Sequence, residues 1–188
     1  MNQEFETKVL NINKKEVEKK LKNLGAKKLS SSLMRRWVFD WLDEDLESDY
    51  GWIRLRQEGK KVTLTYKNRR AMSKSDTKEL ETEVNNFDMT AEILQKIPFK
   101  RKFYQENKRT VYVFEDVEFM IDEWPGLKPH LEIEGKTKEA LTKGITLLEF
   151  TGKDSGDISV NKIYKDELNV DLHKIERLSF DFFKEDKA

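Results

Sequence analysis

The stretch RTVYVFEDVEFMIDEWPGLKPHLEIEG, residues 109–135, decides the fold class of this 188-residue chain. β-Forming residues alternate with polar ones in its first half, which predicts two strands with a turn at Glu115-Asp116. The Trp124-Pro125-Gly126 turn then leads into HLEIEG, which predicts a third strand. Short connections of this kind join antiparallel neighbours, so the stretch indicates an antiparallel sheet.

Further strands and helices are predicted on both sides of this stretch. Strands are expected within residues 3–10, 33–41, 51–59, 60–70 and 79–85, and helices within 13–24, 90–98, 137–150 and 159–168. The first helix has the clearest boundaries, because Asn13 and Glu16 have capping-box spacing and Gly25 follows its last turn. About eight short strands with three or four helices predict a single α+β domain over residues 1–188.

Composition narrows the function classes. Lysine plus arginine and aspartate plus glutamate number 36 each, so the basic excess typical of a duplex-binding protein is missing. The absence of cysteine excludes disulfides, thiolate metal sites and a cysteine nucleophile, and two histidines are too few for a histidine-rich metal site. No apolar run has the length of a membrane helix, and the N-terminus does not resemble a signal peptide. We therefore expect a cytoplasmic monomer or homodimer whose partners include neither a nucleic-acid duplex nor a membrane.

Ionisable and apolar side chains occupy opposite faces of the predicted strands, because successive residues of a strand point to opposite sides. The like-charged pairs on these faces are Glu4 with Glu6, Arg54 with Arg56, Lys67 with Arg69, Glu81 with Glu83, and Glu132 with Glu134. An open sheet whose charged face meets water would explain the alternation. A closed sheet whose charged faces line a lumen would explain it as well, and eight strands suffice to enclose one small ligand.

The like-charged pairs favour the closed alternative if a ligand lies between them. Enclosure strengthens repulsion, which a polyanion between basic pairs and a divalent cation between acidic pairs would relieve. Mg²⁺ prefers oxygen ligands, and arginine matches phosphate oxygens bidentately. The residue types therefore fit a closed eight-stranded antiparallel β-barrel, a tunnel with a polar lumen and flanking helices, that holds a phosphate-bearing anion and a divalent cation. The open sheet stays the alternative at this point.

The order of the charged motifs resembles that of the CYTH, or triphosphate tunnel, superfamily. Glu4-Phe-Glu6-Thr-Lys8 matches the ExExK signature, and Arg54-Leu-Arg56 resembles the RxR strand. Later matches are Lys67 in the next basic strand, Glu81-Thr-Glu83 as the mid-chain ExE, and the closing set of Arg109, Asp122 and Glu132-Ile-Glu134. The chain departs from the pattern at Asn107, where the family often has a basic residue that Lys102 or Lys108 would have to replace. Arg35 and Arg36 do not align securely, so either is a candidate for the lumen.

The resemblance implies an enzyme that acts on triphosphates with Mg²⁺ or Mn²⁺. The implied metal ligands are Glu4, Glu6, Asp122, Glu132 and Glu134. The implied triphosphate ligands are Lys8, Arg54, Arg56, Lys67, Arg69 and Arg109. The expected catalytic residues are Glu4, Glu6, Lys8, Glu81 and Glu83. Either a second metal or a carboxylate, with Glu81 and Glu83 as candidates, would orient the attacking water, and Lys8 would bind phosphate or position that water.

Three activities fit this scaffold. In the first, which we favour, water attacks the terminal phosphorus of tripolyphosphate or of a nucleoside or organic triphosphate. In the second, the ribose 3′-hydroxyl of ATP attacks the α-phosphorus, as in a class IV adenylyl cyclase that forms cyclic AMP and pyrophosphate. The third is a binding module for polyphosphate or nucleotide without turnover, against which the full set of carboxylates argues.

Overall fold

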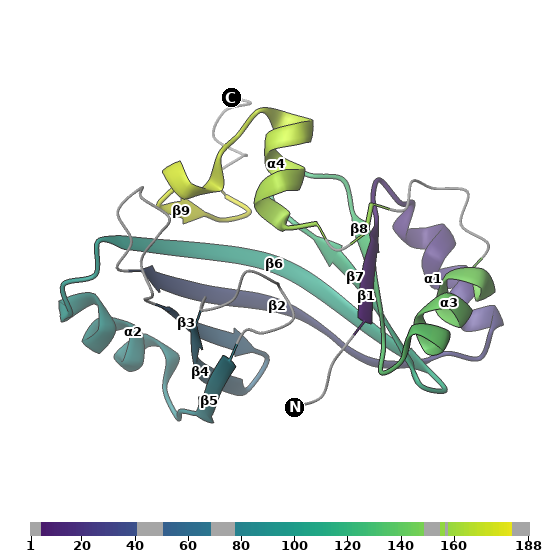
Figure 1. Ribbon diagram of the computed structural model, residues 1–188, viewed down its shortest axis with the longest axis horizontal. Coiled ribbons are helices and arrows are strands. Elements are labelled where there is room, and N and C mark those ends of the chain that lie inside the picture. Colours follow the sequence, from purple (N-terminus) through teal and green to yellow (C-terminus); the bar gives the residue numbers. More distant parts are fainter. Residues whose placement is uncertain (1–4, 41–50, 69–77, 149–154, 157, 182–188) are drawn as a thin grey trace. The chain divides into compact units, whose positions relative to one another are not determined.

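The computed structural model describes residues 5–40, 51–68, 78–148, 155–156 and 158–181, and its elements are labelled in Figure 1. The strands are β1 (Phe5–Val9), β2 (Lys27–Asp40), β3 (Trp52–Glu58), β4 (Lys61–Asn68), β5 (Lys78–Glu83), β6 (Arg101–Phe114), β7 (Val117–Glu123), β8 (His130–Gly135) and β9 (Arg177–Leu178). The helices are α1 (Lys14–Asn23), α2 (Phe87–Lys96), α3 (Lys138–Leu147) and α4 (Val160–Leu168), and a short 3₁₀ helix covers Leu172–Lys174. The predicted mixture of an antiparallel sheet with helices is confirmed.

Local sequence signals explain where the helices begin. The Asn13 side chain accepts hydrogen bonds from the backbone amides of Lys15 and Glu16, as the capping-box spacing predicted for α1. Helix α2 begins at Phe87, three residues earlier than expected, because the side chain of Asn86 caps it by accepting from the Met89 amide at 2.9 Å.

The prediction of a closed barrel is wrong. Among the described residues the strand order is β1-β8-β7-β6-β2-β3-β4-β5, with β9 added parallel to β6, so the path of pairings ends at β1 and at β5. The hydrogen bonds at the outer edge of β1 give a local reason why the sheet does not close there. There the Lys8 amide donates to the Gly156 carbonyl at 3.2 Å, and the Ser155 amide donates to the Lys8 carbonyl at 3.0 Å. The backbone groups that barrel closure would use at Lys8 are therefore occupied by the connection between α3 and α4.

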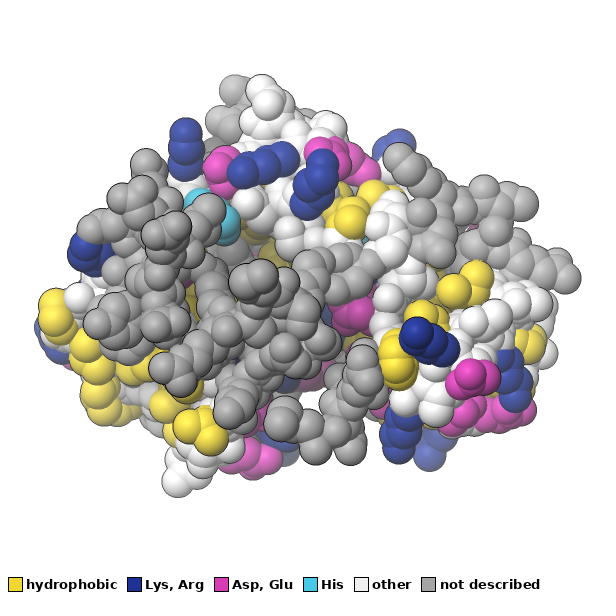
Figure 2. Space-filling model, in the orientation of Figure 1, with side chains coloured by type: hydrophobic (Ala, Val, Ile, Leu, Met, Phe, Trp, Pro, Cys, Tyr) yellow, Lys and Arg dark blue, Asp and Glu magenta, His cyan; other side chains and the backbone are white. Residues whose placement is uncertain are grey.

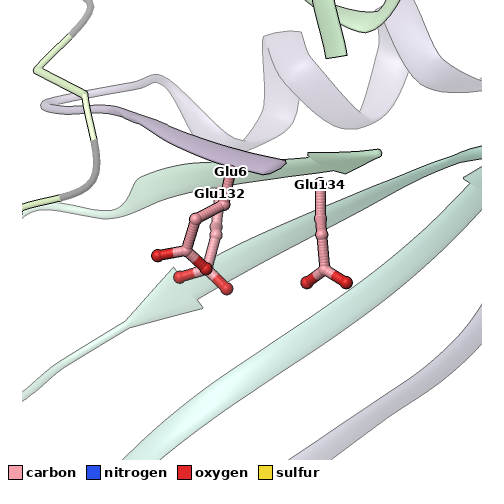
Figure 3. Close-up of side chains that lie close together, drawn as sticks. All are labelled: Glu6, Glu132 and Glu134. Carbon is pink, nitrogen blue, oxygen red and sulfur yellow. The ribbon is translucent and has the colours of Figure 1, made fainter. Parts of the chain in front are cut away.

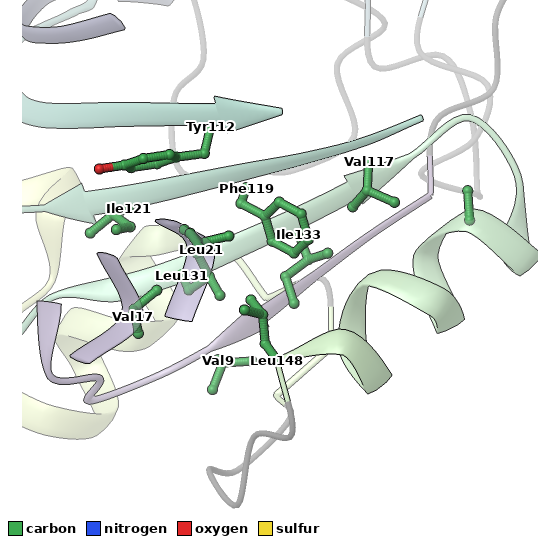
Figure 4. Close-up of a cluster of buried hydrophobic side chains, with 11 residues drawn as sticks. Val9, Val17, Leu21, Tyr112, Val117, Phe119, Ile121, Leu131, Ile133 and Leu148 are labelled. Atoms are coloured by element: carbon green, nitrogen blue, oxygen red, sulfur yellow. The ribbon is translucent and has the colours of Figure 1, made fainter. Parts of the chain in front are cut away.

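The chain forms two compact units, and β2 and β6 each contribute residues to both. The first unit comprises residues 1–32 and 107–172, and the second comprises 33–106 and 173–188. In the first unit, α1 and α3 supply apolar side chains to a core with one face of β1, β8, β7 and β6 (Figure 4). Leu21, Phe119, Leu131 and Ile133 are fully buried there, so the opposite face of these strands is left for the polar residues.

The second unit has its own core on one face of β2, β3 and β4. Phe39 and Leu55 are fully buried there and pack with Phe87, Ala91 and Leu94 of α2. On the face of the molecule in Figure 2, positive and negative side chains are interspersed, as the balanced composition leads one to expect. In the part of the chain that the structure describes, no helix is long and apolar enough to span a lipid bilayer.

Candidate functional site

Three carboxylates from neighbouring strands converge in the first unit. Strands β1 and β8 are antiparallel with Glu6 opposite Glu134 and Lys8 opposite Glu132. Figure 3 shows that the side chains of Glu6, Glu132 and Glu134 project to the same side of these strands. One carboxylate oxygen of each lies within 4.8 Å of the other two. Oxygen ligands at this spacing fit a hard divalent cation such as Mg²⁺ or Mn²⁺, so the donor set suits the metal that the sequence predicts.

Lys8 lies between two of these carboxylates. Its Nζ atom is 2.8 Å from Oε1 of Glu6 and 3.3 Å from Oε2 of Glu132, and only 7% of its side chain is exposed. Lys8 and Glu6 share a face of β1 because they are two residues apart, and the strand pairing brings Glu132 beside them. The ammonium group therefore offsets part of the repulsion among the carboxylates.

Arg109 is held rigidly by Asp122. Its Nε and Nη2 atoms donate to the two carboxylate oxygens of Asp122 at 2.8 and 2.5 Å, in the bidentate geometry that a guanidinium favours. The same Nη2 lies 3.4 Å from Glu132, while Nη1 contacts the sulfur of Met120. The fully buried Asn107 also donates to Asp122, at 3.0 Å. The orientation of Arg109 is thus set by β7 and by its own strand β6.

We call six charged residues of this face the acidic cluster: Glu6, Lys8, Arg109, Asp122, Glu132 and Glu134. Glu118, which is opposite Glu134 in the register of β7 with β8, is an exposed carboxylate on the same face and is not counted in the cluster. At their formal charges, its four carboxylates and two cations leave two negative charges in excess. A divalent cation would balance that excess. Burial makes the balance matter, because Asp122 is 1% exposed and Glu132 is 8% exposed.

His130 also lies on the buried polar face of the first unit. Its position in the sequence did not predict this location. It is the first residue of β8, lies opposite Asp122 in the strand register and is 1% exposed. Burial lowers the pKa of His130, although the negative charges of Asp122 and Glu132 act in the opposite direction. The imidazole is therefore neutral near pH 7 and does not change the excess charge of the acidic cluster.

The second unit carries a basic face. Strand register places Arg54 opposite Thr65, and Arg56 opposite both Thr63 and Arg36. Lys67 lies two residues beyond Thr65 on the same face of β4. Two arginines that face each other across neighbouring strands repel, so this surface is suited to a multiply charged anion.

The structure also resolves the ambiguity between the two adjacent arginines of β2. Arg36 belongs to the basic face, whereas Arg35 lies on the opposite face. Arg35 donates there to Gln57 at 2.7 Å and forms a bidentate pair with Asp88 at 2.9 and 3.0 Å. The sequence alone could not assign Arg36 to this face, because the two arginines are equivalent until the register of β2 with β3 is known.

The predicted mid-chain carboxylates lie on the same side of the second unit as the basic residues. Glu81 is opposite Thr65, whose hydroxyl donates to it at 2.7 Å, and it lies 4.0 Å from the Arg54 guanidinium. Glu83 is opposite Thr63 and is paired with Lys61 at 3.4 Å. Of the two, Glu81 is the one in contact with a predicted phosphate ligand.

Two predicted site residues, Glu4 and Arg69, lie outside the described residues. Of the proposed replacements for a basic residue at Asn107, Lys108 is on the opposite face of β6, since it follows Asn107 directly in the strand. Lys102 belongs to the second unit, where its ammonium donates to the carbonyl of Gln95. Neither lysine therefore shares the face of β6 that carries Asn107 and Arg109. Instead, Asn107 contributes to the site by holding Asp122.

Comparison with known proteins identifies the family. The model of the CYTH domain matches residues 2–163, and the chain therefore belongs to the CYTH domain family. A relative from Methanocaldococcus jannaschii, MJ0240, provisionally named an adenylate cyclase, is 29% identical over 147 residues, which cover 78% of this chain and 84% of the relative.

Solved structures share the fold. The PH1819 protein of Pyrococcus horikoshii superposes with a TM-score of 0.64 and 23% identity over 87% of this chain and 99% of its own. HpAC1 of Hippeastrum, provisionally named an adenylyl cyclase and described as having a dominant triphosphatase activity, superposes with a TM-score of 0.60. It is 17% identical, over 88% of this chain and 96% of its own.

Proposed function

We propose that this chain is a divalent-metal-dependent triphosphatase that hydrolyses inorganic tripolyphosphate, a nucleoside triphosphate or another organic triphosphate. One observation carries the proposal: Glu6, Glu132 and Glu134 converge beside the buried Lys8 and the half-buried Arg109, and the acidic cluster has two negative charges in excess. Membership of the CYTH family and the triphosphatase activity described for HpAC1 support hydrolysis.

The acidic cluster would hold Mg²⁺ or Mn²⁺ through Glu6, Glu132 and Glu134, with Glu4 as the further ligand that the sequence predicts. When bound, such an ion neutralises phosphate oxygens and lowers the pKa of a coordinated water. Asp122 was also predicted as a metal ligand. Because both of its oxygens accept hydrogen bonds from Arg109, we assign it to the positioning of that arginine.

Arg109 is oriented to bind a phosphate oxygen. Its Nη1 atom donates to the Met120 thioether, which is a weak acceptor, so a phosphate oxygen would be the better partner. Lys8 would exchange part of its contact with Glu6 for a phosphate oxygen. Arg54, Arg56 and Lys67, together with Arg69, are proposed as the other triphosphate ligands.

Glu81 and Glu83 are the proposed carboxylates that orient the attacking water. Glu81 is preferred because the Thr65 hydroxyl fixes its carboxylate at 2.7 Å. Glu83 is occupied by Lys61. Positioning and charge stabilisation of this kind supply most of the catalysis in phosphoryl transfer.

Adenylyl cyclase activity is the second candidate, because the curated relative MJ0240 is provisionally named for it. The metal and phosphate ligands would be the same in both reactions. In the cyclase the 3′-hydroxyl of ATP attacks the α-phosphorus and pyrophosphate leaves. In the hydrolase water attacks the terminal phosphorus and orthophosphate leaves.

One assay separates these activities. The protein is incubated with Mg²⁺ or Mn²⁺, and with EDTA as a control, in the presence of either tripolyphosphate or ATP. Orthophosphate release that requires the metal supports the triphosphatase, whereas cyclic AMP with pyrophosphate supports the cyclase. Binding of either compound with no product would show a module without turnover. The Glu132→Gln, Glu134→Gln double variant is expected to abolish turnover, and undiminished activity would remove both residues from the site.

A further inference from the structure

A cavity lies in the second unit, on the face of its sheet opposite Arg54 and Arg56. Trp37 is opposite Leu55 in the register of β2 with β3, so its side chain lies on the core side of the sheet. The cavity has a volume of about 430 Å³, and an adjacent cavity of about 310 Å³ shares Trp37, Gln95 and Arg177 with it. These volumes are within the roughly 300–1,000 Å³ of small-molecule sites.

We call this cavity the Trp37 cavity, because the Trp37 ring lines it and aromatic neighbours behind that ring hold it in place. The half-buried Trp37 ring packs edge-on against Tyr104 with 5.3 Å between ring centroids, and it stacks on Phe39 at 5.9 Å. The Tyr104 hydroxyl donates to Glu106 at 2.7 Å, and the other oxygen of Glu106 accepts from the Phe180 amide. Burial and Glu106 raise the pKa of Tyr104 to about 12, so the phenol stays neutral and keeps this contact.

Positively charged side chains lie at the rim of the Trp37 cavity. The Arg177 guanidinium lies 4.2 Å above the centroid of the Tyr104 ring, and β9 is parallel to β6 at this point. The Lys102 ammonium donates to the Gln95 carbonyl at 2.8 Å. Neither cation forms an ion pair with a carboxylate of a described residue. With Lys100 they make three cations around the larger cavity, against the single carboxylate of Glu176 among its described lining residues.

We propose that the Trp37 cavity is a second binding site, for an aromatic anion of the nucleoside monophosphate type. The flat ring would pack on Trp37, where an aromatic face is already fixed. Arg177 and Lys102 would bind the phosphate, and stacking on Tyr104 leaves the edge of the Arg177 guanidinium free to form a bidentate contact. The site requires no metal. Among the described residues, the cluster of three or more potential metal ligands lies in the first unit.

The test measures the binding of AMP by isothermal titration calorimetry in EDTA. Chelation removes the metal on which the proposed triphosphate chemistry depends, so failure of one proposal leaves the other intact. We expect saturable AMP binding, with adenosine and ribose 5-phosphate each at least about tenfold weaker, because each lacks one of the two recognised groups. The Arg177→Gln, Lys102→Gln variant is expected to lose at least about tenfold in AMP affinity.

Each of two control variants removes two positive charges at positions outside the Trp37 cavity. Lys96→Gln with Lys174→Gln changes exposed lysines that do not line the cavity, and Arg54→Gln with Arg56→Gln changes the basic face. Both are expected to bind AMP like the unmodified protein, and circular dichroism melting checks that all variants are folded. Three results would overturn the proposal: no saturable AMP binding, an equal loss in all three variants, or a loss confined to the Arg54, Arg56 variant.

Discussion

Replacing Glu132 by glutamine probes the acidic cluster at its centre. The substitution removes one negative charge and preserves the size and shape of the side chain. The Glu132 carboxylate lies 3.3 Å from Lys8 and 3.4 Å from Arg109, and it is one of the three proposed metal ligands. The variant should therefore change both the stability of the metal-free protein and its response to metal.

The metal-free effect follows from the ion pairs. Removing one partner of a buried pair costs about 3–5 kcal/mol when the other charge is left alone. Here Lys8 keeps Glu6 at 2.8 Å, and Arg109 keeps its bidentate contact with Asp122. We therefore expect a smaller loss, about 1–2 kcal/mol, which lowers the Tm of a chain of this size by about 2–8 °C.

The change in Tm on adding metal follows from the linkage between metal binding and unfolding. At a free Mn²⁺ concentration of 100 times Kd, binding stabilises the unmodified protein by about 2.7 kcal/mol, or about 5–11 °C in Tm. If losing one ligand weakens binding about 100-fold, the same Mn²⁺ concentration adds only about 0.4 kcal/mol, or about 1–2 °C.

Differential scanning calorimetry in EDTA and in Mn²⁺ measures both effects. Asp116→Asn is the matched control, because it removes an exposed carboxylate of the same unit that lies outside the acidic cluster. A full Mn²⁺-dependent rise in Tm for Glu132→Gln would refute its role as a ligand. An unchanged Tm in EDTA would refute the argument from the ion pairs with Lys8 and Arg109.

Three further predictions concern other parts of the chain. Arg56→Gln should weaken tripolyphosphate binding by about ten- to hundredfold and leave monophosphate binding almost unchanged, as titration calorimetry would measure. Without an anion, the Tm of this variant should not fall, because Arg36 lies opposite Arg56. Tyr104→Phe should remove a step near pH 12 from the tyrosinate absorbance titration. The pKa of Tyr104 in the folded protein exceeds the ordinary tyrosine pKa of 10.0, so the stability contributed by this hydroxyl is complete below about pH 10 and is lost as the pH rises towards about 12. Gly144→Ala in α3 should lower the free energy of unfolding by about 1–2 kcal/mol in urea titrations, because the new Cβ would lie 2.7 Å from Val117 Cγ1 and the cost of overpacking exceeds the gain in helix propensity.

The controls for these predictions come from the same elements. Arg35→Gln, on the opposite face of the sheet from Arg56, should leave tripolyphosphate binding unchanged, and a loss equal to that of Arg56→Gln would mean that position in the sheet is irrelevant. Tyr66→Phe should leave the step near pH 12 in place. An alanine variant at Gly144 as stable as the unmodified protein would show that Val117 can move aside at no cost.

Much of the fold could be predicted because short-range sequence patterns determine most of its helices, turns and strands. The cap at Asn13, the turn at Glu115-Asp116 and the alternation in HLEIEG each depend on residues within one element or one turn. Helix α2 begins three residues before its predicted start, because the Asn86 side chain caps it and the apolar spacing further along the helix gives no sign of that cap. Strands β2 and β6 are 14 residues each and longer than expected, since their polar ends have no period-two signal.

The candidate site was only partly predictable. The charged residues of the acidic cluster, from Glu6 to Glu134, were selected from alternation and motif order, and they do share one face. The roles of Asn107 and His130 could not be inferred, because each depends on which residue lies opposite or diagonal on a neighbouring strand. The alternation of side chains along a strand has a period of two in every pairing register. It therefore shows which residues share a face and does not show which residues of the neighbouring strand lie opposite them.

By itself, the sequence determined the classes of element, the division of each strand into a charged and an apolar face, and the membership of a superfamily, since all three depend on local spacing and motif order. Only the tertiary structure decided that the sheet stays open, because an alternating strand is identical in open and closed sheets until its edge partner is known. At the edge of β1 that partner is the Ser155-Gly156 segment, which takes the hydrogen bonds of Lys8. The same pairing geometry, with Glu6 opposite Glu134 and Lys8 opposite Glu132, decided which charges meet.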